Sequence, residues 1–443
     1  MTQIVTRIAP SPTGQMHIGT VRTALFNYIF AKQHGGTYFV RIEDTDKERS
    51  RAEWIDAIWK DFEWCGLTPD ARYIQSEHAE RHRELLAALV AEGKAYVSKE
   101  PSRDDPSRQV EVVRLKNPGT RITFTDLIRG DVSFDTAELG DFVIARAIDD
   151  PLYHFAVVVD DKDAGVTHII RAEEHLSNTP RQILIQEALG FSRPQYAHIP
   201  LILAPDRTKL SKRKHAASLE HYRDEGYLPE AIINYLALLG WNPGTDEEHF
   251  SLSELVERFS LDRVQKSGAI FDETKLKSVN QHWMRKLSID DFITRGALEA
   301  NDSNTLRLAV PLLKERARTF GEARELLSGE LSCLFTQPSL DKSQLLAKEP
   351  KDRPGIAATA LKSLSEAVRE LPAEISADGV KEALMPLADA EEARGKGGRG
   401  AVLWPLRYAL SGQERSPDPF TLISILGPVE AASRVEKAVA ILG

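Results

Sequence analysis

The sequence predicts an α/β domain of the dinucleotide-binding type, followed by a largely helical chain. Three observations predict this fold class. A strand-like run at residues 3–9 leads through a tight turn into a helical pattern at 20–32. Strand-like and helical segments alternate up to about residue 95, and again between 167 and 203. After residue 206 the apolar periodicity stays mostly helical to the end of the chain.

The first 95 residues contain the clearest elements. Residues 37–42 are predicted to form a buried strand, and residues 53–65 and 79–92 to form helices. Pro10, Pro12 and Gly14 end the first strand and shape the turn that follows it. Gly19 opens the next helix, where the missing Cβ allows a ring or a phosphate to approach the backbone. The free amide donors of a helix N-terminus also favour an anion there.

A β-rich stretch interrupts the alternation. A polar run at residues 98–108 is expected to break the chain, and short strands are predicted at 110–115, 122–124, 132–134 and 142–147. We therefore expect residues 96–147 to be an insertion in the first domain. The alternation returns with a strand at 167–171, a helix at 179–189 and a strand at 197–203.

Composition excludes several classes of protein. The 443 residues suggest two to four domains, with 42% hydrophobic residues, 28% charged residues and a net charge of −9. No apolar run is long enough for a membrane span, and the N-terminus lacks a signal-peptide pattern. Cys65 and Cys333 are far apart, which argues against a disulfide and against a cysteine-rich zinc site. We expect a cytoplasmic protein with no membrane contact, whose acidic body can still carry a local basic groove.

Two motifs far apart in the chain suit a nucleotide triphosphate. His17 in the early turn can donate a hydrogen bond to a phosphate oxygen. The late stretch at residues 206–215, DRTKLSKRKH, is basic in an otherwise acidic chain. Lys209 and Lys212 could close over a triphosphate and stabilise the charge that grows at the α-phosphate as pyrophosphate leaves. Mg²⁺ normally accompanies such a substrate. The alternative is a solvated basic loop.

Charged residues also follow two predicted strands. Glu43 and Arg171 each stand at a strand end, where this fold places its ligand crevice. The Glu43 carboxylate could receive an ammonium group. The Arg171 guanidinium could hold a carboxylate through two parallel hydrogen bonds. The alternative is a set of surface ion pairs that cap the strands.

Five motifs in this order resemble those of bacterial glutamyl-tRNA synthetases, which are class I aminoacyl-tRNA synthetases. They are RIAPSPTG with HIGT (residues 7–14 and 17–20), RIEDTD (41–46), IRAEE (170–174), KLSKR (209–213) and the connector YLPEAIINYLALLGW (227–241). The late segment WPLRYALSG (404–412) also fits, so the resemblance covers nearly the whole chain.

The resemblance implies a class I catalytic domain of the Rossmann type at residues 1–95 and 148–205. Residues 96–147 would be a small α+β insertion that binds the tRNA acceptor end. Residues 206–295 would be a helical connector carrying the KLSKR loop, and 296–370 and 371–443 two all-α anticodon-binding subdomains. The implied reaction joins L-glutamate to tRNA(Glu) with ATP and Mg²⁺, through a glutamyl-adenylate, and releases AMP and diphosphate. A cytoplasmic monomer is expected.

The resemblance also implies roles for individual residues. Catalysis falls to His17, Lys209 and Lys212. ATP binding falls to Gly19, Glu174, His175, Lys209, Leu210 and Lys212. The glutamate pocket comprises Arg7, Ala9, Ser11, Glu43, Tyr153, Val157 and Arg171. Contacts with tRNA are expected from Asp46, Arg49, Arg394, Lys396, Arg399 and Arg407.

The chain departs from the family pattern in three places. The segment between Tyr96 and Val112 is several tens of residues shorter than usual, so the grip on the acceptor end is expected to differ. The insertion lacks cysteines, so no zinc is expected there. Pro386 lies near the position where some relatives carry an arginine that rejects tRNA(Gln), which leaves tRNA(Gln) open as a second substrate.

Three other kinds of protein share part of this pattern. A shorter relative glutamylates a modified base of tRNA(Asp), but it ends near the connector. A catalytically silent tRNA-binding paralogue would lack His17 or Lys212. A smaller nucleotidyltransferase would lack the lysine loop and the helical tail. This chain continues past the connector, and it has His17, Lys212, the lysine loop and the helical tail.

Overall fold

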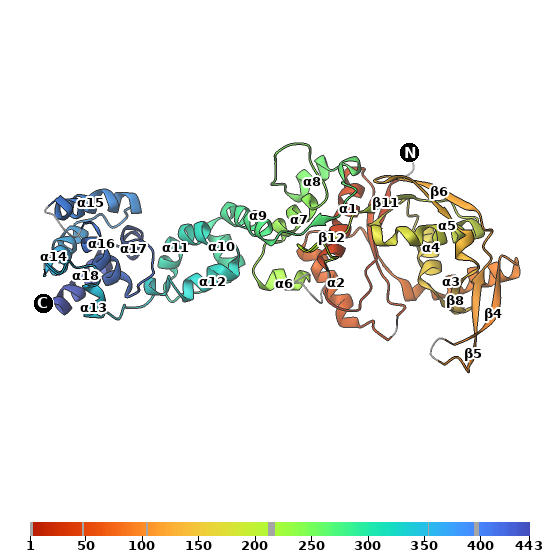
Figure 1. The fold of residues 1–443 in the computed structure, drawn as a ribbon, viewed down its shortest axis with the longest axis horizontal. Coiled ribbons are helices and arrows are strands. Elements are labelled where there is room, and N and C mark those ends of the chain that lie inside the picture. Colours follow the sequence, from red (N-terminus) through yellow and green to blue (C-terminus); the bar gives the residue numbers. More distant parts are fainter. Residues whose placement is uncertain (1–2, 47, 103–104, 211–217, 353, 394–397) are drawn as a thin grey trace. The chain divides into compact units, whose positions relative to one another are not determined.

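The computed structural model describes residues 3–443 except 47, 103–104, 211–217, 353 and 394–397 (Figure 1). The chain divides into two compact units, Met1–Asn280 and Gln281–Gly443.

A parallel sheet forms the centre of the first unit. It consists of β1 (Val5–Ile8), β2 (Thr37–Ile42), β3 (Ala71–Ile74), β10 (His168–Ala172) and β11 (Gln195–Ile199). β1, β2 and β3 pair in that order, and β10 pairs with β11. β10 lies beside β1, where the Thr167 N–H donates to the Val5 carbonyl at 3.0 Å. The strand order is therefore β3-β2-β1-β10-β11. The chain adds strands towards one edge of the sheet before β10 and towards the other edge after it, and such sheets bind ligands at this switch point between β1 and β10.

Helices connect these strands. They are α1 (Ile18–Gln33), α2 (Ala52–Trp64), α3 (Ala79–Ala91), α4 (Tyr153–Asp163) and α5 (Thr179–Leu189). α1 is buried on most sides, because its apolar residues belong to the same core as those of α7 (Pro229–Leu238). This packing fixes the N-terminal end of α1 close to the end of β1.

The predicted insertion contains two groups of antiparallel strands. β4 (Ala95–Pro101), β5 (Gln109–Leu115), β8 (Phe142–Ala147) and β9 (Asp150–Pro151) form one sheet. β6 (Arg121–Asp126) and β7 (Gly130–Asp135) form a hairpin. β6 also pairs in parallel with β11, at Asp126 and Tyr196. The hairpin is thus continuous with the central sheet.

Two sequence-based predictions of elements are wrong. The expected break at 98–108 begins too early, because β4 pairs with β5 residue by residue as far as Pro101 and Gln109. Pairing here outweighs the polar composition. The single strand expected at 197–203 is divided into β11 and β12 (Ile202–Leu203). Pro200 lies at the break, and it has no N–H to give to a ladder.

The rest of the first unit is mainly helical. β12 pairs with the short β13 (Ala269–Ile270). The helices are α6 (Leu219–Asp224), α7, α8 (Leu252–Arg258) and the start of α9 (Glu273–Lys286).

The second unit has only helices among its described regular elements. After the end of α9 come α10 (Ile289–Gly296), α11 (Ser303–Arg316), α12 (Phe320–Ser328), α13 (Lys342–Leu345), α14 (Ile356–Arg369), α15 (Ala377–Ala393), α16 (Gly400–Ser411), α17 (Pro419–Leu426) and α18 (Pro428–Leu442). Across the described parts of both units, no helix combines the length and apolar character needed to cross a membrane.

Candidate active site

A cavity of about 560 Å³ opens at the carboxyl ends of β1 and β10. Most of the predicted site residues line it. Those residues are Arg7, Ala9, Ser11, His17, Gly19, Glu43, Tyr153, Arg171, Glu174, His175, Lys209 and Leu210. The fold thus brings together residues separated by up to two hundred positions in the chain, at the switch point where ligands are expected.

His17 forms the N-cap of α1. Its Nδ1 accepts a hydrogen bond from the Gly19 N–H at 2.9 Å. In a neutral imidazole the proton is then on Nε2, which makes Nε2 a donor. A Cβ at Gly19 would lie only 3.0 Å from Nδ1, so glycine permits this close contact. The turn therefore presents a histidine donor beside a helix N-terminus, an arrangement that suits a phosphate.

The histidine turn and the lysine stretch meet at this cavity. Leu210 donates its N–H to the Ile202 carbonyl at 3.0 Å, which attaches the start of the stretch to β12. Beyond residue 217, Ser218 forms a bridge with His17, and Leu219 donates to the Met16 carbonyl at 2.9 Å. Both flanks of the stretch are therefore fixed beside the cavity. Lys212 lies outside the described residues.

Lys209 forms an ion pair with Glu174 at the cavity. Its Nζ contacts the Glu174 carboxylate, and both side chains are partly exposed. Glu174 follows β10 in the short helix Glu173–Asn178. Solvent screens such a pair, so it contributes little stability and can be exchanged for a pair with a ligand.

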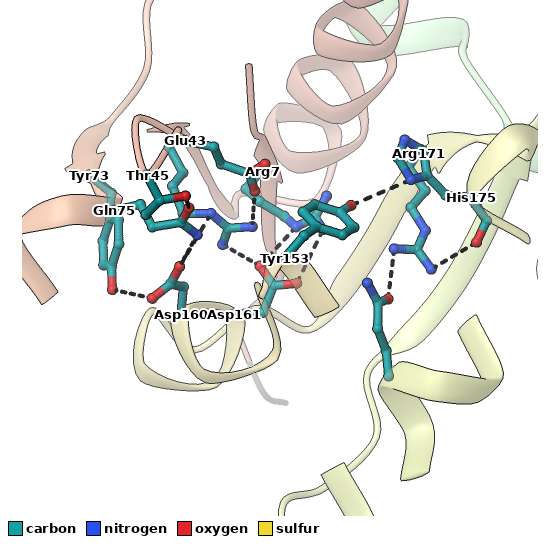
Figure 2. Close-up of polar contacts among 12 residues, drawn as sticks. Arg7, Glu43, Thr45, Tyr73, Gln75, Tyr153, Asp160, Asp161, Arg171 and His175 are labelled. Carbon is teal, nitrogen blue, oxygen red and sulfur yellow. Dashed lines mark hydrogen bonds and ion pairs between the residues drawn. The ribbon is translucent and has the colours of Figure 1, made fainter. Parts of the chain in front are cut away.

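On the other side of the cavity, Arg7 and Glu43 belong to one buried charge network (Figure 2). Arg7 donates to both oxygens of Asp161, at 3.0 and 3.1 Å. Arg41 joins the same carboxylate at 2.6 Å and donates to Glu43 at 3.1 Å. The order Arg7–Asp161–Arg41–Glu43 alternates in charge. It fixes the distance between a cationic and an anionic group on the cavity wall.

Burial affects the two carboxylates of this network differently. Burial raises the pKa of Asp161, but the charges of Arg7 and Arg41 outweigh it, so the net shift is downward. At Glu43 burial is the larger effect and the pKa rises, although Arg41 opposes it. Asp161 is therefore the more strongly ionised of the two carboxylates. A further cation beside Glu43 would stabilise its ionised form.

A second aspartate, Asp160, lies next to Arg41 of this network. It is fully buried and receives hydrogen bonds from Tyr73 (3.0 Å), Gln75 (2.6 Å) and His82 (2.6 Å). Arg41 Nε lies 3.8 Å away. Sequence reasoning missed Arg41, Asp160 and Asp161. Only Arg41 carried a signal, because it stands inside the apolar run at residues 37–42 and a buried charge requires a partner. Asp160 and Asp161 follow an apolar run and are succeeded by two more charged residues, which is also the pattern of a helix end at the surface.

Arg171 lies at the end of β10 with only 4% of its surface exposed. Its three guanidinium nitrogens donate to His198 (3.1 Å), Gln182 (2.8 Å) and Thr179 (2.8 Å), with a longer bond of 3.4 Å to the His175 carbonyl. A two-bond grip on a carboxylate would require that longest bond to be replaced. The surrounding protein thus holds Arg171 in one orientation.

His175 and Tyr153 line the cavity between these two sides. The Tyr153 hydroxyl lies 3.4 Å from His175 Nδ1 (Figure 2). Burial, followed by the charge of Arg171, lowers the pKa of His175 to about 4. The ring is therefore neutral at pH 7, which suits stacking on an aromatic base. Val157 of α4 is buried and does not line the cavity.

Comparison with known proteins identifies the family. The family model described as tRNA synthetases class I (E and Q), catalytic domain, matches residues 3–104 and 102–278. The chain belongs to this family. A second model, described as an anticodon binding domain, matches residues 275–439.

Two relatives of this class I synthetase are both named glutamate–tRNA ligase. The chain is 40% identical to the glutamate–tRNA ligase of Moorella thermoacetica, over 99% of this chain and 98% of that one. It is 41% identical to the glutamate–tRNA ligase of Azorhizobium caulinodans, over 98% and 99%. A crystal structure of a glutamate tRNA ligase from Elizabethkingia meningosepticum, in complex with its amino acid, superimposes with a TM-score of 0.85 at 30% identity and covers 100% of both chains.

One buried side chain of this class I synthetase was not expected from its sequence. Arg22 of α1 donates to the Leu239 carbonyl at 2.8 Å and also to the Pro200 carbonyl. Burial lowers its pKa to about 10. Arg22 lines the cavity and joins α1 to the strand break before β12 and to the end of α7.

The residues predicted to contact tRNA lie elsewhere. Asp46 and Arg49 pair with each other at 2.6 Å on the surface. Arg399 pairs with Asp389 at 2.7 Å, and Arg407 lies over the Trp404 ring at 4.7 Å. Arg394 and Lys396 lie outside the described residues.

Metal binding has little support from the protein side chains. Among the described residues, no three His, Cys, Asp or Glu side chains are grouped to hold an ion. The absence of zinc stays a prediction.

Proposed function

We propose that this class I synthetase ligates L-glutamate to tRNA(Glu) with ATP, through a glutamyl-adenylate, and releases AMP and diphosphate. The observation that carries the proposal is the single cavity with two chemically different sides. One side has a histidine turn and a lysine, and the other has the paired charges around Arg7 and Glu43. The names of its relatives support the same reaction.

The first step needs alignment and charge stabilisation rather than a protein nucleophile. The α-carboxylate of glutamate attacks the α-phosphorus of ATP, the bond to the β-phosphate oxygen breaks, and pyrophosphate leaves. His17 Nε2 and the Lys209 ammonium group would meet the phosphate oxygens, and the resemblance assigns Lys212 the same task. Gly19, Leu210, Glu174 and His175 would hold the nucleotide. Mg²⁺ bound to the triphosphate would neutralise part of its charge.

Recognition of glutamate needs opposite charges at its two ends. Glu43 would meet the α-ammonium group, while Arg7 and Arg171 would meet the side-chain carboxylate. Ala9, Ser11 and Tyr153 would complete the pocket by resemblance, whereas Val157 does not line the cavity. Glutamine would be rejected, because its amide places an NH₂ group against a cation and accepts fewer charged hydrogen bonds.

The second step uses tRNA. The terminal ribose hydroxyl attacks the acyl carbon, loses its proton and displaces AMP. The insertion at 96–147 would hold the acceptor end, and Asp46 and Arg49 would add further tRNA contacts. The helical subdomains would bind the anticodon, with contacts from Arg394, Lys396, Arg399 and Arg407. We propose a cytoplasmic monomer.

Charging assays test this function directly. Purified enzyme, ATP–Mg²⁺ and radiolabelled glutamate should give Glu-tRNA with purified tRNA(Glu), whereas radiolabelled glutamine should not. The same assay with tRNA(Gln) decides whether that tRNA is a second substrate. A lack of ATP-dependent charging of tRNA(Glu) would refute the proposal.

Lys209→Ala tests the nucleotide side. Loss of one charged donor should slow tRNA-dependent pyrophosphate exchange by about 10²–10³-fold. Lys32→Ala is the matched control, because Lys32 pairs with Asp70 in the last turn of α1, at the opposite end from the cavity. A Lys209→Ala enzyme as fast as this control would contradict the assignment.

A further inference from the structure

The orientation of Arg171 depends on a residue in the neighbouring strand. β10 and β11 pair so that Arg171 lies opposite His198. Arg171 Nε donates to His198 Nε2 at 3.1 Å, and His198 is completely buried. A guanidinium nitrogen can only donate, so His198 Nε2 must be the acceptor. The contact therefore requires a neutral imidazole with its proton on Nδ1.

Asp126 supplies the group that fixes this tautomer. His198 Nδ1 lies 2.6 Å from Asp126 Oδ2. The carboxylate is itself held by the backbone N–H groups of Ile128 (3.0 Å), Arg129 (2.9 Å) and His198 (3.0 Å). Asp126 is the last residue of β6, and only 1% of its surface is exposed. The carboxylate is therefore held in one position, where it accepts a hydrogen bond from the Nδ1–H group of His198.

The charges around His198 also favour its neutral form. Burial is the main influence, and it lowers the pKa of His198. The charges of Arg171 and Arg129 lower it further, whereas Asp126 raises it, and the net shift is downward. The ring thus stays neutral at pH 7 and keeps Nε2 available to Arg171.

Two residues of α5 complete the surroundings of the guanidinium. Thr179 Oγ1 accepts from Arg171 Nη2 at 2.8 Å and lies 3.1 Å from His198 Nε2. Gln182 Oε1 accepts from Nη1 at 2.8 Å. These contacts restrict rotation of the guanidinium plane. The orientation of the group towards the cavity then depends on the position of His198.

We infer that Asp126 and His198 are positioning residues that aim Arg171 at the substrate, and that they thereby set the preference for glutamate over glutamine. The inference rests on the proposed function, in which Arg171 meets the substrate carboxylate. Neither residue lines the cavity, so both act through Arg171.

Asp126→Asn separates this role from simple packing. The asparagine keeps the size of the side chain, and its oxygen can keep the backbone bonds of Ile128 and Arg129, although the 3.0 Å bond from the His198 N–H is lost. Its NH₂ group would then face His198 Nδ1 and move the ring proton to Nε2. Nε2–H and the Arg171 Nε–H would confront each other as two donors. Arg171 must then turn away.

The experiment uses the full-length enzyme in steady-state charging of tRNA(Glu), with glutamate and glutamine as competing substrates. Asp126→Asn and His198→Phe should each raise KM for glutamate by about tenfold or more and lower the glutamate-to-glutamine ratio of kcat/KM by a similar factor. KM for ATP should stay unchanged, and kcat should stay within about threefold. His198→Gln, whose oxygen can reach the position of Nε2, should recover most of the preference.

Two further variants complete the design. Tyr196→Phe is the matched control, because it removes one buried hydrogen bond to Gln186 from the same strand and leaves the Asp126–His198–Arg171 contacts intact. It should behave like wild type. Arg171→Lys measures the dependence on Arg171 itself, and it should lose the preference for glutamate.

The outcomes separate the two hypotheses. A wild-type enzyme that does not charge tRNA(Glu) with glutamate would refute the proposed function before any variant is compared. If wild type charges and Arg171→Lys loses the preference, while folded Asp126→Asn and His198→Phe keep wild-type KM and preference, the positioning role is overturned. Thermal unfolding reports folding. If His198→Phe does not fold, Asp126→Asn and His198→Gln decide the result.

Discussion

At the scale of one residue, the Glu43 carboxylate is buried beside a single cation. It is buried, Arg41 holds it at 3.1 Å, and burial still raises its pKa. One cation therefore does not fully compensate for the loss of water. A second cation, such as the ammonium group of an amino acid, would stabilise the ionised form.

Lowering the pH should weaken glutamate binding through Glu43. Because its pKa is raised, the carboxylate takes up a proton at a higher pH than an exposed glutamate would, and the neutral acid cannot pair with an ammonium group. KM for glutamate should rise as the pH falls from neutral towards the usual pKa of a free glutamate side chain. In Glu43→Gln, KM should be high throughout and show no such rise. A wild-type KM that stays constant over this range would contradict the role.

Single residues on the cavity wall were easier to predict than the residues behind them. Glu43 and Arg171 stand at strand ends and could be placed from the strand pattern alone. Arg41, Asp161 and His198 are buried, and their partners come from other strands and helices. Sequence periodicity shows that such residues are internal, but it does not show which charges meet.

Helix α4 has a structural role that its sequence did not reveal. Asp161 on this helix binds Arg7 of β1 and Arg41 of β2, so one carboxylate joins a helix to two strands. Removing its charge takes from the buried Arg7 the carboxylate with which it pairs, and leaves Arg41 with Glu43 and Asp160 alone.

Asp161→Asn should therefore destabilise the first unit strongly, by about 3–5 kcal/mol. Asp163→Asn on the same helix is the matched control. Asp163 pairs with Arg81 at the partly exposed surface, and its loss should cost at most about 1 kcal/mol. Urea unfolding of both variants measures the difference. Equal values would show that the buried network contributes no more than a surface pair.

Elements with strong local signals were predicted well. The strand at 37–42 and the helix at 179–189 coincide with β2 and α5. β3, whose residues are partly exposed, and α4, which carries two buried aspartates, were not predicted. Their formation depends on neighbours supplied by distant parts of the chain, so tertiary contacts override the local pattern.

At the scale of the whole molecule, the comparisons and the internal contacts divide the chain into two parts at nearly the same place. The catalytic family model ends at 278, the anticodon-binding model begins at 275, and the compact units divide after Asn280.

In the second unit, Arg434 is buried and donates to the carbonyls of Cys333 (2.7 Å) and Leu410 (2.8 Å). It connects three segments of that unit.

Arg434→Met should lower the stability of the second unit alone. Two buried carbonyls lose their donor, at a cost of about 2–3 kcal/mol, which corresponds to about 5–10 °C in one thermal transition. The transition that glutamate and ATP raise, and KM for glutamate, should stay unchanged. Arg369→Met removes an exposed pair with Glu436 and serves as control. A shift of both transitions by the same amount would show that the units unfold together.

Arg22 has a consequence for synthesis of the protein on the ribosome. Its hydrogen bond to Leu239 spans 217 positions, and its bond to Pro200 spans 178. A nascent chain that has emerged only as far as the insertion has β1, α1 and β2 but lacks both carbonyls that this guanidinium needs. The cavity wall is thus completed only after α7 has left the exit tunnel, and until then the N-terminal half carries a guanidinium group that still lacks both its partners and the core that buries it.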